Sequence, residues 1–288
     1  MIRSTLAHLH IAALSHAGMS GKNNEDRYAI SSFQLSRDDS RRAVFAVVSD
    51  GIGGHRAGEV AAELGVNYIT MGVGESNAKK PVRILESAIH DASQAIASHS
   101  AGKDEEEGMG ATCACAWVIE NRLYTAYVGD SRIYLLRGKQ IQRLTVDHTW
   151  VQEAFEKGII TAEQMRDHPN VHVIRRYLGG IKLPDVDFRL RIDNEESKEE
   201  SENNQGFHLE PGDTILLCTD GLTDLVWDDE ILKIIRSKKD MKQAAESLIN
   251  LANDRGGHDN ITVVIMSMPR LEETTNKKPG FLGWLLGE

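Results

Sequence analysis

Five aspartates in this sequence of 288 residues stand beside turn-forming residues, and each adjoins a stretch of strand-like or polar turn character. They occur in Asn24-Glu25-Asp26, Asp50-Gly51, Gly129-Asp130, Thr219-Asp220-Gly221 and Gly257-His258-Asp259. Taken singly, each fits equally well a carboxylate that caps a backbone N–H in a turn. Two apolar stretches, however, run directly into Asp-Gly, which places a carboxylate at the rim of a core where glycine permits close backbone approach. We therefore predict that these carboxylates converge.

Carboxylates that converge with few histidines and no suitable cysteine favour hard divalent cations such as Mg²⁺ or Mn²⁺. Zinc would be expected to recruit histidine or cysteine. Two such ions could share a bridging carboxylate and hold a hydroxide for in-line attack on phosphorus. This chemistry suits phosphate monoesters, whose uncatalysed hydrolysis is among the slowest known. The sequence lacks two alternatives: a C-x₅-R phosphatase motif and a G-x₄-G-K-[ST] phosphate loop.

The elements that must position these carboxylates can be read from hydrophobic patterns. Strands are predicted at Ala43–Ser49, Thr112–Ile119, Arg122–Val128, Arg132–Arg137, Thr214–Thr219 and Ile261–Met268. Helices are predicted at Pro81–Ser98, between Gly58 and Gly74 with Val60, Ala61, Leu64 and Tyr68 on one side, and around Met241, Ala245, Leu248 and Ala252. The very short gaps between the middle three strands indicate antiparallel hairpins. Antiparallel strands with helices grouped separately predict an α+β layered fold.

We expect one domain over residues 1–270 and a tail over residues 271–288. Residues 193–206 are acidic, rich in Asn and Ser and without periodicity, which predicts an exposed, mobile loop. The apolar run Phe281–Leu286 in the tail is too short to span a bilayer.

Composition excludes several classes of protein. The chain has 33 Lys plus Arg against 43 Asp plus Glu, a net charge of -10, which argues against a nucleic-acid binder. Its three cysteines lie in apolar runs and are read as small buried hydrophobic residues, with no disulfide framework. No membrane span and no signal peptide are recognisable. We expect a cytoplasmic monomer.

Five stretches together resemble the metal-dependent protein serine/threonine phosphatases of type 2C, in their bacterial form. They are NNEDRYAI (from Asn23), VVSDGIGGHRAGEVAA (from Val47), the run from Gly110 to Ile160 that includes GATCACAWVI and YVGDSRIYLLRG, LLCTDGLTDLV (from Leu216) and GGHDNITVVI (from Gly256). They occur in the order typical of that family and cover most of the chain from Leu14 to Met268. The resemblance implies a four-layer α-β-β-α sandwich in which two central antiparallel sheets are flanked by helices, with a binuclear Mn²⁺ or Mg²⁺ site at one end.

The resemblance also implies the ligands of these ions, which are Asp26, Asp50, Gly51, Asp130, Asp220 and Asp259. Asp50 would bridge both ions and the Gly51 carbonyl would bind one of them. Asp130, with Asp220, would hold a looser third ion. Residues 147–180 resemble the flap that influences substrate choice in the family, although an amphipathic helix with a surface loop fits this segment equally well.

One position departs from the family pattern. The arginine that usually precedes the first metal aspartate by five residues is replaced by Gly21. Our hypothesis is that the adjacent Lys22 partly replaces it as a point charge for the substrate phosphate, without the forked geometry of a guanidinium. The alternative is that Lys22 is a solvated turn residue. His55 is a further candidate, either as a proton donor to the leaving group or as a structural residue after a glycine turn.

The sequence thus predicts an Mn²⁺- or Mg²⁺-dependent enzyme, with Asp50 and His55 as candidate catalytic residues. It would hydrolyse phosphoserine and phosphothreonine in proteins without a phosphoenzyme, and so oppose a serine/threonine kinase. The alternative is a weak or inactive regulatory binding module on the same fold, a reading that Gly21 favours.

Overall fold

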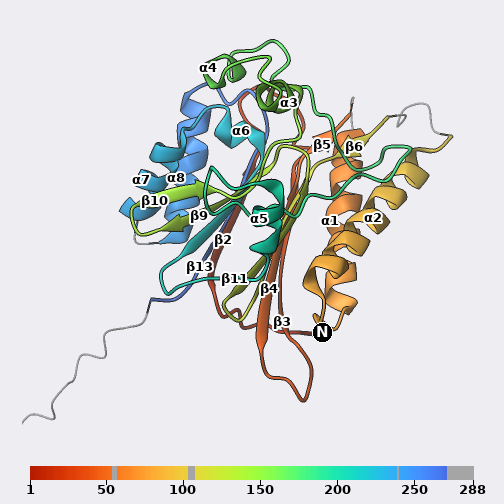
Figure 1. Ribbon diagram of the computed structural model, residues 1–288, viewed down its shortest axis with the longest axis vertical. Coiled ribbons are helices and arrows are strands. Elements are labelled where there is room, and N and C mark those ends of the chain that lie inside the picture. Colours follow the sequence, from red (N-terminus) through yellow and green to blue (C-terminus); the bar gives the residue numbers. More distant parts are fainter. Residues whose placement is uncertain (54–56, 103–107, 239, 271–288) are drawn as a thin grey trace, which may run out of the picture.

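Two antiparallel sheets form the centre of the computed structural model, which describes residues 1–53, 57–102, 108–238 and 240–270 (Figure 1). The strand order is β1-β3-β4-β7-β8-β11 in the first sheet and β10-β9-β12-β13-β2 in the second. The first sheet comprises β1 (Ile2–Arg3), β3 (Arg27–Gln34), β4 (Arg42–Ser49), β7 (Cys113–Ile119), β8 (Arg122–Val128) and β11 (Phe207–His208). The second comprises β10 (Gln140–Arg143), β9 (Arg132–Arg137), β12 (Thr214–Cys218), β13 (Ile261–Ser267) and β2 (His10–His16). A small ladder joins β5 (Gly51–Ile52) to β6 (Gly110–Ala111).

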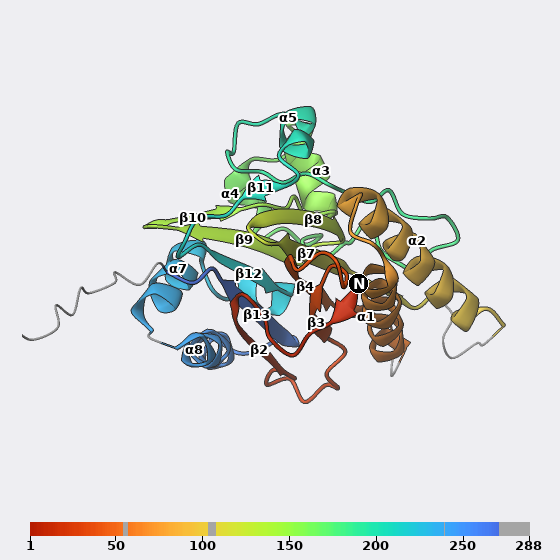
Figure 2. The same ribbon diagram turned by 90° about the horizontal axis from the view of Figure 1, so that it is seen from below.

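Long helices cover the outer face of each sheet. Helices α1 (Ala57–Glu75) and α2 (Pro81–Ser100) lie on the first sheet, and α7 (Asp228–Ser237) and α8 (Met241–Asp254) lie on the second, as the view along the layers shows (Figure 2). The short helices are α3 (Trp150–Glu156), α4 (Ala162–Met165), α5 (Lys198–Asn203) and α6 (Asp220–Thr223). The predicted four-layer α-β-β-α sandwich is therefore confirmed.

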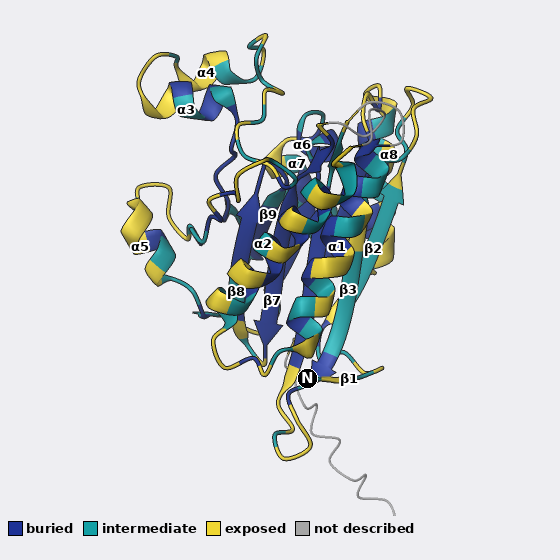
Figure 3. Cartoon of the chain, turned by 90° about the vertical axis from the view of Figure 1, so that its right-hand side faces the viewer, coloured by how far each residue is buried: buried dark blue, intermediate teal, exposed yellow. Residues whose placement is uncertain are grey.

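Three hydrophobic cores fill the spaces between the four layers. Because successive side chains of a strand point to opposite faces of its sheet, each central strand contributes to two of these cores. In β4, Phe45 and Val47 pack under α1 and α2, whereas Val44 and Ala46 point into the core between the sheets. The central strands, such as β4 and β7, are therefore buried on both faces, while the outer sides of the helices stay exposed (Figure 3). This explains why the central strands read as continuous apolar runs.

Most predicted elements are present. The six predicted strands correspond to β6 with β7, and to β4, β8, β9, β12 and β13, and the helices near residues 81–98 and 241–252 correspond to α2 and α8. The three cysteines are buried, as predicted. Strands β2, β3 and β10 were not predicted. Strands β2 and β10 are edge strands, and all three carry mostly half-buried residues, so none has a long apolar run.

The predicted helix between Gly58 and Gly74 is present as α1. Of the four residues predicted on one side, Ala61 is buried and Val60 and Leu64 pack partly buried against the core, whereas Tyr68 is 38% exposed. Gly65 and Ile69 are buried, and a Cβ added to Gly72 would lie 2.9 Å from the Cβ of Ala88 on α2. Small residues mark the helix contact here, and a hydrophobicity pattern does not register glycine.

The acidic segment 193–206 contains a helix, where the sequence predicted only an exposed, mobile loop. Ser197 and Glu200 form a capping box at the start of α5, and Ser201 is fully buried. The side-chain amide of Gln205 accepts a hydrogen bond from the Thr125 N–H and donates to the Thr125 carbonyl, which ties the segment to β8. Polar hydrogen bonds, and no apolar stripe, hold this helix, so hydrophobic periodicity could not reveal it.

Some expectations concern residues outside the described ones. The tail 271–288 and His55 belong to this group. In the described part of the chain, no helix combines the length and apolar character that a membrane span requires.

Candidate metal centre

The sheet pairings bring all five predicted aspartates to one end of the sandwich. Asp26 precedes β3 and Asp50 follows β4, and these strands pair so that Arg27 lies opposite Ser49. In the second sheet, Cys218 at the end of β12 lies opposite both Arg132 and Val263, so the segments that carry Asp130, Asp220 and Asp259 meet at the same end. Antiparallel neighbours start and finish at the same end of a sheet. Turns that are far apart in the sequence therefore lie close together at that end.

Burial and mutual repulsion raise the pKa values of the inner carboxyl groups. Burial, followed by the nearby charge of Asp220, raises the pKa of Asp26 to about 7. Burial first and then Asp224 raise the pKa of Asp220 to about 6. The pKa of Asp50 is raised well above its usual value by burial, by Asp26 and by other carboxylates of the group. The pKa of Asp130 is likewise raised well above its usual value, by burial and then by Asp220. Such shifts mean that the centre lacks positive charge.

Three of these carboxylates have a buried oxygen with no hydrogen-bond partner among the described residues: Oδ1 of Asp26, of Asp130 and of Asp220. A buried carboxylate oxygen without a partner is costly, and native proteins rarely tolerate several in one place. Divalent cations with a preference for oxygen ligands would satisfy all three oxygens and reverse the pKa shifts. The residues present therefore fit Mn²⁺ or Mg²⁺.

Hydroxyl groups of neighbouring threonines hold the backbone of Asp50 and the carboxylate of Asp26 in place. Thr112 Oγ1 accepts the backbone N–H of Asp50 at 2.9 Å. Thr219 Oγ1 donates to Oδ2 of Asp26 at 2.8 Å and accepts the N–H of Thr262 at 3.0 Å. One oxygen of Asp26 is thus fixed by the second sheet while the other points into the centre.

Glycines allow the loops of the centre to approach one another closely. A Cβ on Gly51 would lie 2.1 Å from the Gly58 carbonyl oxygen, and a Cβ on Gly221 would lie 2.0 Å from the Asn260 carbonyl oxygen. The side chain of Asn260 accepts the Glu25 N–H at 2.7 Å and so links the segment before β3 to the segment before β13. The backbone around the carboxylates is accordingly well packed.

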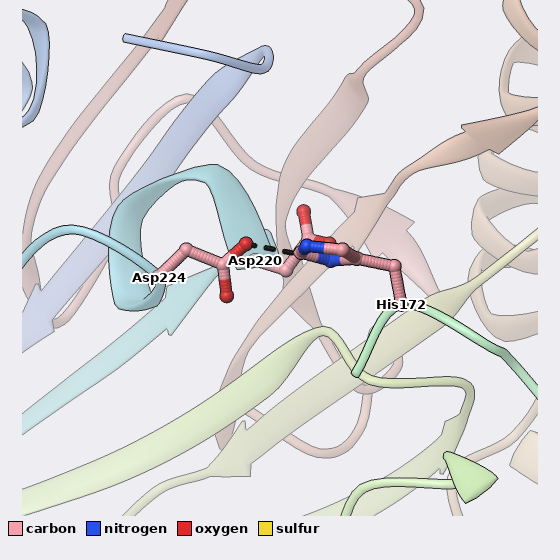
Figure 4. A group of neighbouring side chains, drawn as sticks. All are labelled: His172, Asp220 and Asp224. Carbon is pink, nitrogen blue, oxygen red and sulfur yellow. Dashed lines mark ion pairs between the residues drawn. The ribbon is translucent and has the colours of Figure 1, made fainter. Parts of the chain in front are cut away.

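Two residues at the centre were not singled out from the sequence. His172, in the segment 147–180, points toward Asp220 and Asp224 (Figure 4). Its Nδ1 lies 4.0 Å from Oδ2 of Asp220 and 3.6 Å from Oδ2 of Asp224. The four-residue spacing from Asp220 to Asp224 was a usable signal, because it places both on one side of a helical turn. His172 gave no local signal.

An open cavity of about 580 Å³ adjoins the carboxylates and runs under the segment 147–180. Lys22 lines it together with Asp130, Asp220 and Asp259. Gly21 has a left-handed φ of 74°, and no atom lies within 4 Å of the position that its Cβ would take. The space near Gly21 is therefore open, and Lys22 is the neighbouring cation that faces the cavity.

Arg132 also lines the cavity, but it is already paired. Its Nε and Nη2 donate to the Asp147 carboxylate at 3.1 and 2.7 Å. Ser131 Oγ is hydrogen-bonded to Thr112 Oγ1 at 2.7 Å. Both residues are engaged within the fold, in keeping with their interpretation as hairpin residues.

Comparison with known proteins identifies similar chains. Residues 15–265 match the family described as protein phosphatase 2C. The serine/threonine phosphatase stp of Listeria monocytogenes is 31% identical over 262 residues, which are 90% of this chain and 95% of that protein. The crystal structure of the Mycobacterium tuberculosis serine/threonine phosphatase PstP/Ppp has a TM-score of 0.75 and 32% identity, covering 91% of this chain and 99% of that one. The PstP catalytic domain in complex with two manganese ions has a TM-score of 0.72 and 32% identity, covering 90% and 97%.

Proposed function

The chain belongs to the protein phosphatase 2C family and is a phosphatase, and from this premise we propose that it removes phosphate from phosphoserine and phosphothreonine in proteins by a two-metal mechanism. The single observation that carries the proposal is the group of buried oxygens of Asp26, Asp130 and Asp220 at one end of the sandwich, which find no hydrogen-bond partner in the described part of the chain. Phosphoproteins made by a serine/threonine kinase are the corresponding substrates.

In this proposal the two principal ions would be held by Asp26, Asp50, Asp220 and Asp259 and by the Gly51 carbonyl. The proximity of Asp50 to Asp26, Asp220 and Asp130, which together help to raise its pKa, supports Asp50 as the ligand that would serve both ions. Asp130 and Asp220 would hold a third ion. Bound Mn²⁺ or Mg²⁺ supplies Lewis acidity, which activates water and neutralises phosphate charge.

The chain offers no thiol as an alternative nucleophile. Cys113, Cys115 and Cys218 are all buried. Burial raises the pKa of Cys115 and of Cys218, so neither is a thiolate at neutral pH. Direct attack by water, without a phosphoenzyme, is the reaction that we propose.

Lys22 binds the substrate phosphate in this scheme. It lines the cavity beside Asp259 and Asp220. As a single ammonium it supplies charge without forked hydrogen bonds, so phosphate is held less tightly than by an arginine.

The test measures phosphate release by the purified full chain from a small aryl phosphate and from a phosphothreonine peptide, with Mn²⁺ or with a chelator. We expect release from both compounds with Mn²⁺ and none with chelator. Absence of metal-stimulated release from either compound would reject the proposal and favour the inactive binding module.

A further inference from the structure

The cavity extends beyond the metal centre into a groove whose far end is apolar. We call this part the flap groove and define it by Met165, Arg166, Leu225 and Trp227. Trp227 is 54% exposed, although large aromatic side chains are usually well buried. The groove is continuous with the cavity that Asp220 and Asp259 line. The carboxylates and Trp227 thus line one cavity.

Arg166 joins the two walls of the groove. It follows α4, in the segment 147–180, and its guanidinium carbon lies 3.4 Å from the centre of the Trp227 ring. Its Nη2 donates to the Asp224 carbonyl oxygen at 2.6 Å. A stacked guanidinium that also donates to a backbone carbonyl is a specific contact that lysine cannot reproduce.

A second residue of the same segment lies near the same turn. His172 Nδ1 lies 3.6 Å from the Asp224 carboxylate, four residues after the proposed metal ligand Asp220. This distance is longer than a hydrogen bond. The segment 147–180 thus approaches the turn that carries Asp220 at two points, and the contact of Arg166 is the hydrogen-bonded one. The width of the groove therefore depends on Arg166 and Trp227.

We propose that Arg166 and Trp227 determine substrate specificity by forming a subsite for an apolar side chain next to the phosphorylated residue of the substrate protein. This inference rests on the proposed function and deepens it. Leu225 and Met165 are half-buried beside Trp227, which makes this end of the groove apolar. An aliphatic or aromatic side chain placed there is removed from water and gains contact with the indole.

Charge argues against the other classes of side chain. The carboxylates of Asp167 and Asp224 line the cavity, so an acidic side chain meets repulsion there. The same carboxylates attract a lysine or arginine side chain, but the Arg166 guanidinium already lies on the Trp227 ring, so a second cation at this apolar end meets repulsion. An apolar side chain avoids both costs.

The experiment compares the full chain with Arg166→Ala, Trp227→Ala and Arg166→Lys in Mn²⁺. The substrates are an aryl phosphate, which is too short to reach the flap groove, and three phosphothreonine peptides that differ only in leucine, aspartate or lysine at the positions flanking phosphothreonine. Arg175→Ala is the matched control, because Arg175 belongs to the same segment, is exposed and does not line the cavity. Thermal melting checks that each variant is folded.

We expect wild-type kcat/KM to be highest for the leucine peptide. In Arg166→Ala and Trp227→Ala, the ratio of kcat/KM for the leucine peptide to that for the aryl phosphate should fall about ten-fold, mainly through KM. Arg166→Lys should not restore the ratio, and Arg175→Ala should keep it. Equal wild-type rates on the three peptides, or an unchanged ratio in both alanine variants, would overturn the subsite. Failure of the wild type on the aryl phosphate as well would instead reject the proposed function.

Discussion

Replacing Asp26 by asparagine should stabilise the metal-free protein while it weakens metal binding. Asp26 is 2% exposed, and above its raised pKa of about 7 it carries a charge beside other carboxylates when no cation is bound. Asparagine has the same shape, its Oδ1 can accept the hydrogen bond that Thr219 donates, and its amide can donate to the neighbouring carboxylates. The substitution therefore removes an unpaired buried charge without leaving a cavity.

The pKa of Asp26 sets the magnitude of this effect. The pKa of Asp26 is 3.8 in the unfolded chain and about 7 in the folded, metal-free protein. Between these values the folded state binds more protons, so its stability falls as pH rises through this window. At pH 8 the raised pKa lowers the free energy of unfolding of the metal-free wild type by about 4 kcal/mol, and at pH 5 by roughly a third of that. Asp26→Asn does not suffer this loss.

The assay is urea unfolding of the wild type and Asp26→Asn at pH 5 and pH 8, with chelator and with Mn²⁺. With chelator at pH 8 the variant should unfold at higher urea, and the difference should shrink at pH 5. With Mn²⁺ the order should reverse, because binding to the folded state stabilises the wild type. The exposed Asp91→Asn on α2 is the control for loss of one carboxylate. A variant that is no more stable than the wild type in chelator at pH 8 would refute the reasoning.

Three further substitutions test the centre. Asp50→Asn should lower kcat/KM by more than about 100-fold and abolish at least one site in a Mn²⁺ titration. It should not lower the melting temperature in chelator, and normal turnover would contradict the proposed bridging role of Asp50. Lys22→Ala should raise KM more than it lowers kcat, and unchanged values of both would assign Lys22 to solvent. Gly221→Ala should destabilise the fold by about 2 kcal/mol in chemical denaturation, because its Cβ would lie 2.0 Å from a backbone oxygen of Asn260, and a neutral result would contradict that packing.

The range of each interaction decides which elements the sequence alone can predict. Strand β4 was predictable from its continuous apolar run and helix α2 from its apolar spacing of three and four residues, which are both local features of the chain. Helix α5 was not predictable, because the hydrogen bonds of Gln205 to Thr125 that anchor its segment connect residues 80 positions apart. The side of α1 that contacts α2 was only partly predictable, because glycine makes the close contact there and does not enter a hydrophobic pattern.

The sequence by itself indicated the five aspartates, because each stands in a turn beside a strand. It also showed that Gly21 replaces the arginine of the family pattern, and its strand and helix patterns predicted the α+β layering. These are local properties of the chain. Only the tertiary structure decided that His172 and Asp224 join the centre and that Arg166 stacks on Trp227, 61 positions away in the sequence. The physical reason is that such contacts depend on how separate loops are brought together by strand pairing and packing, and no local pattern of residues specifies that distance.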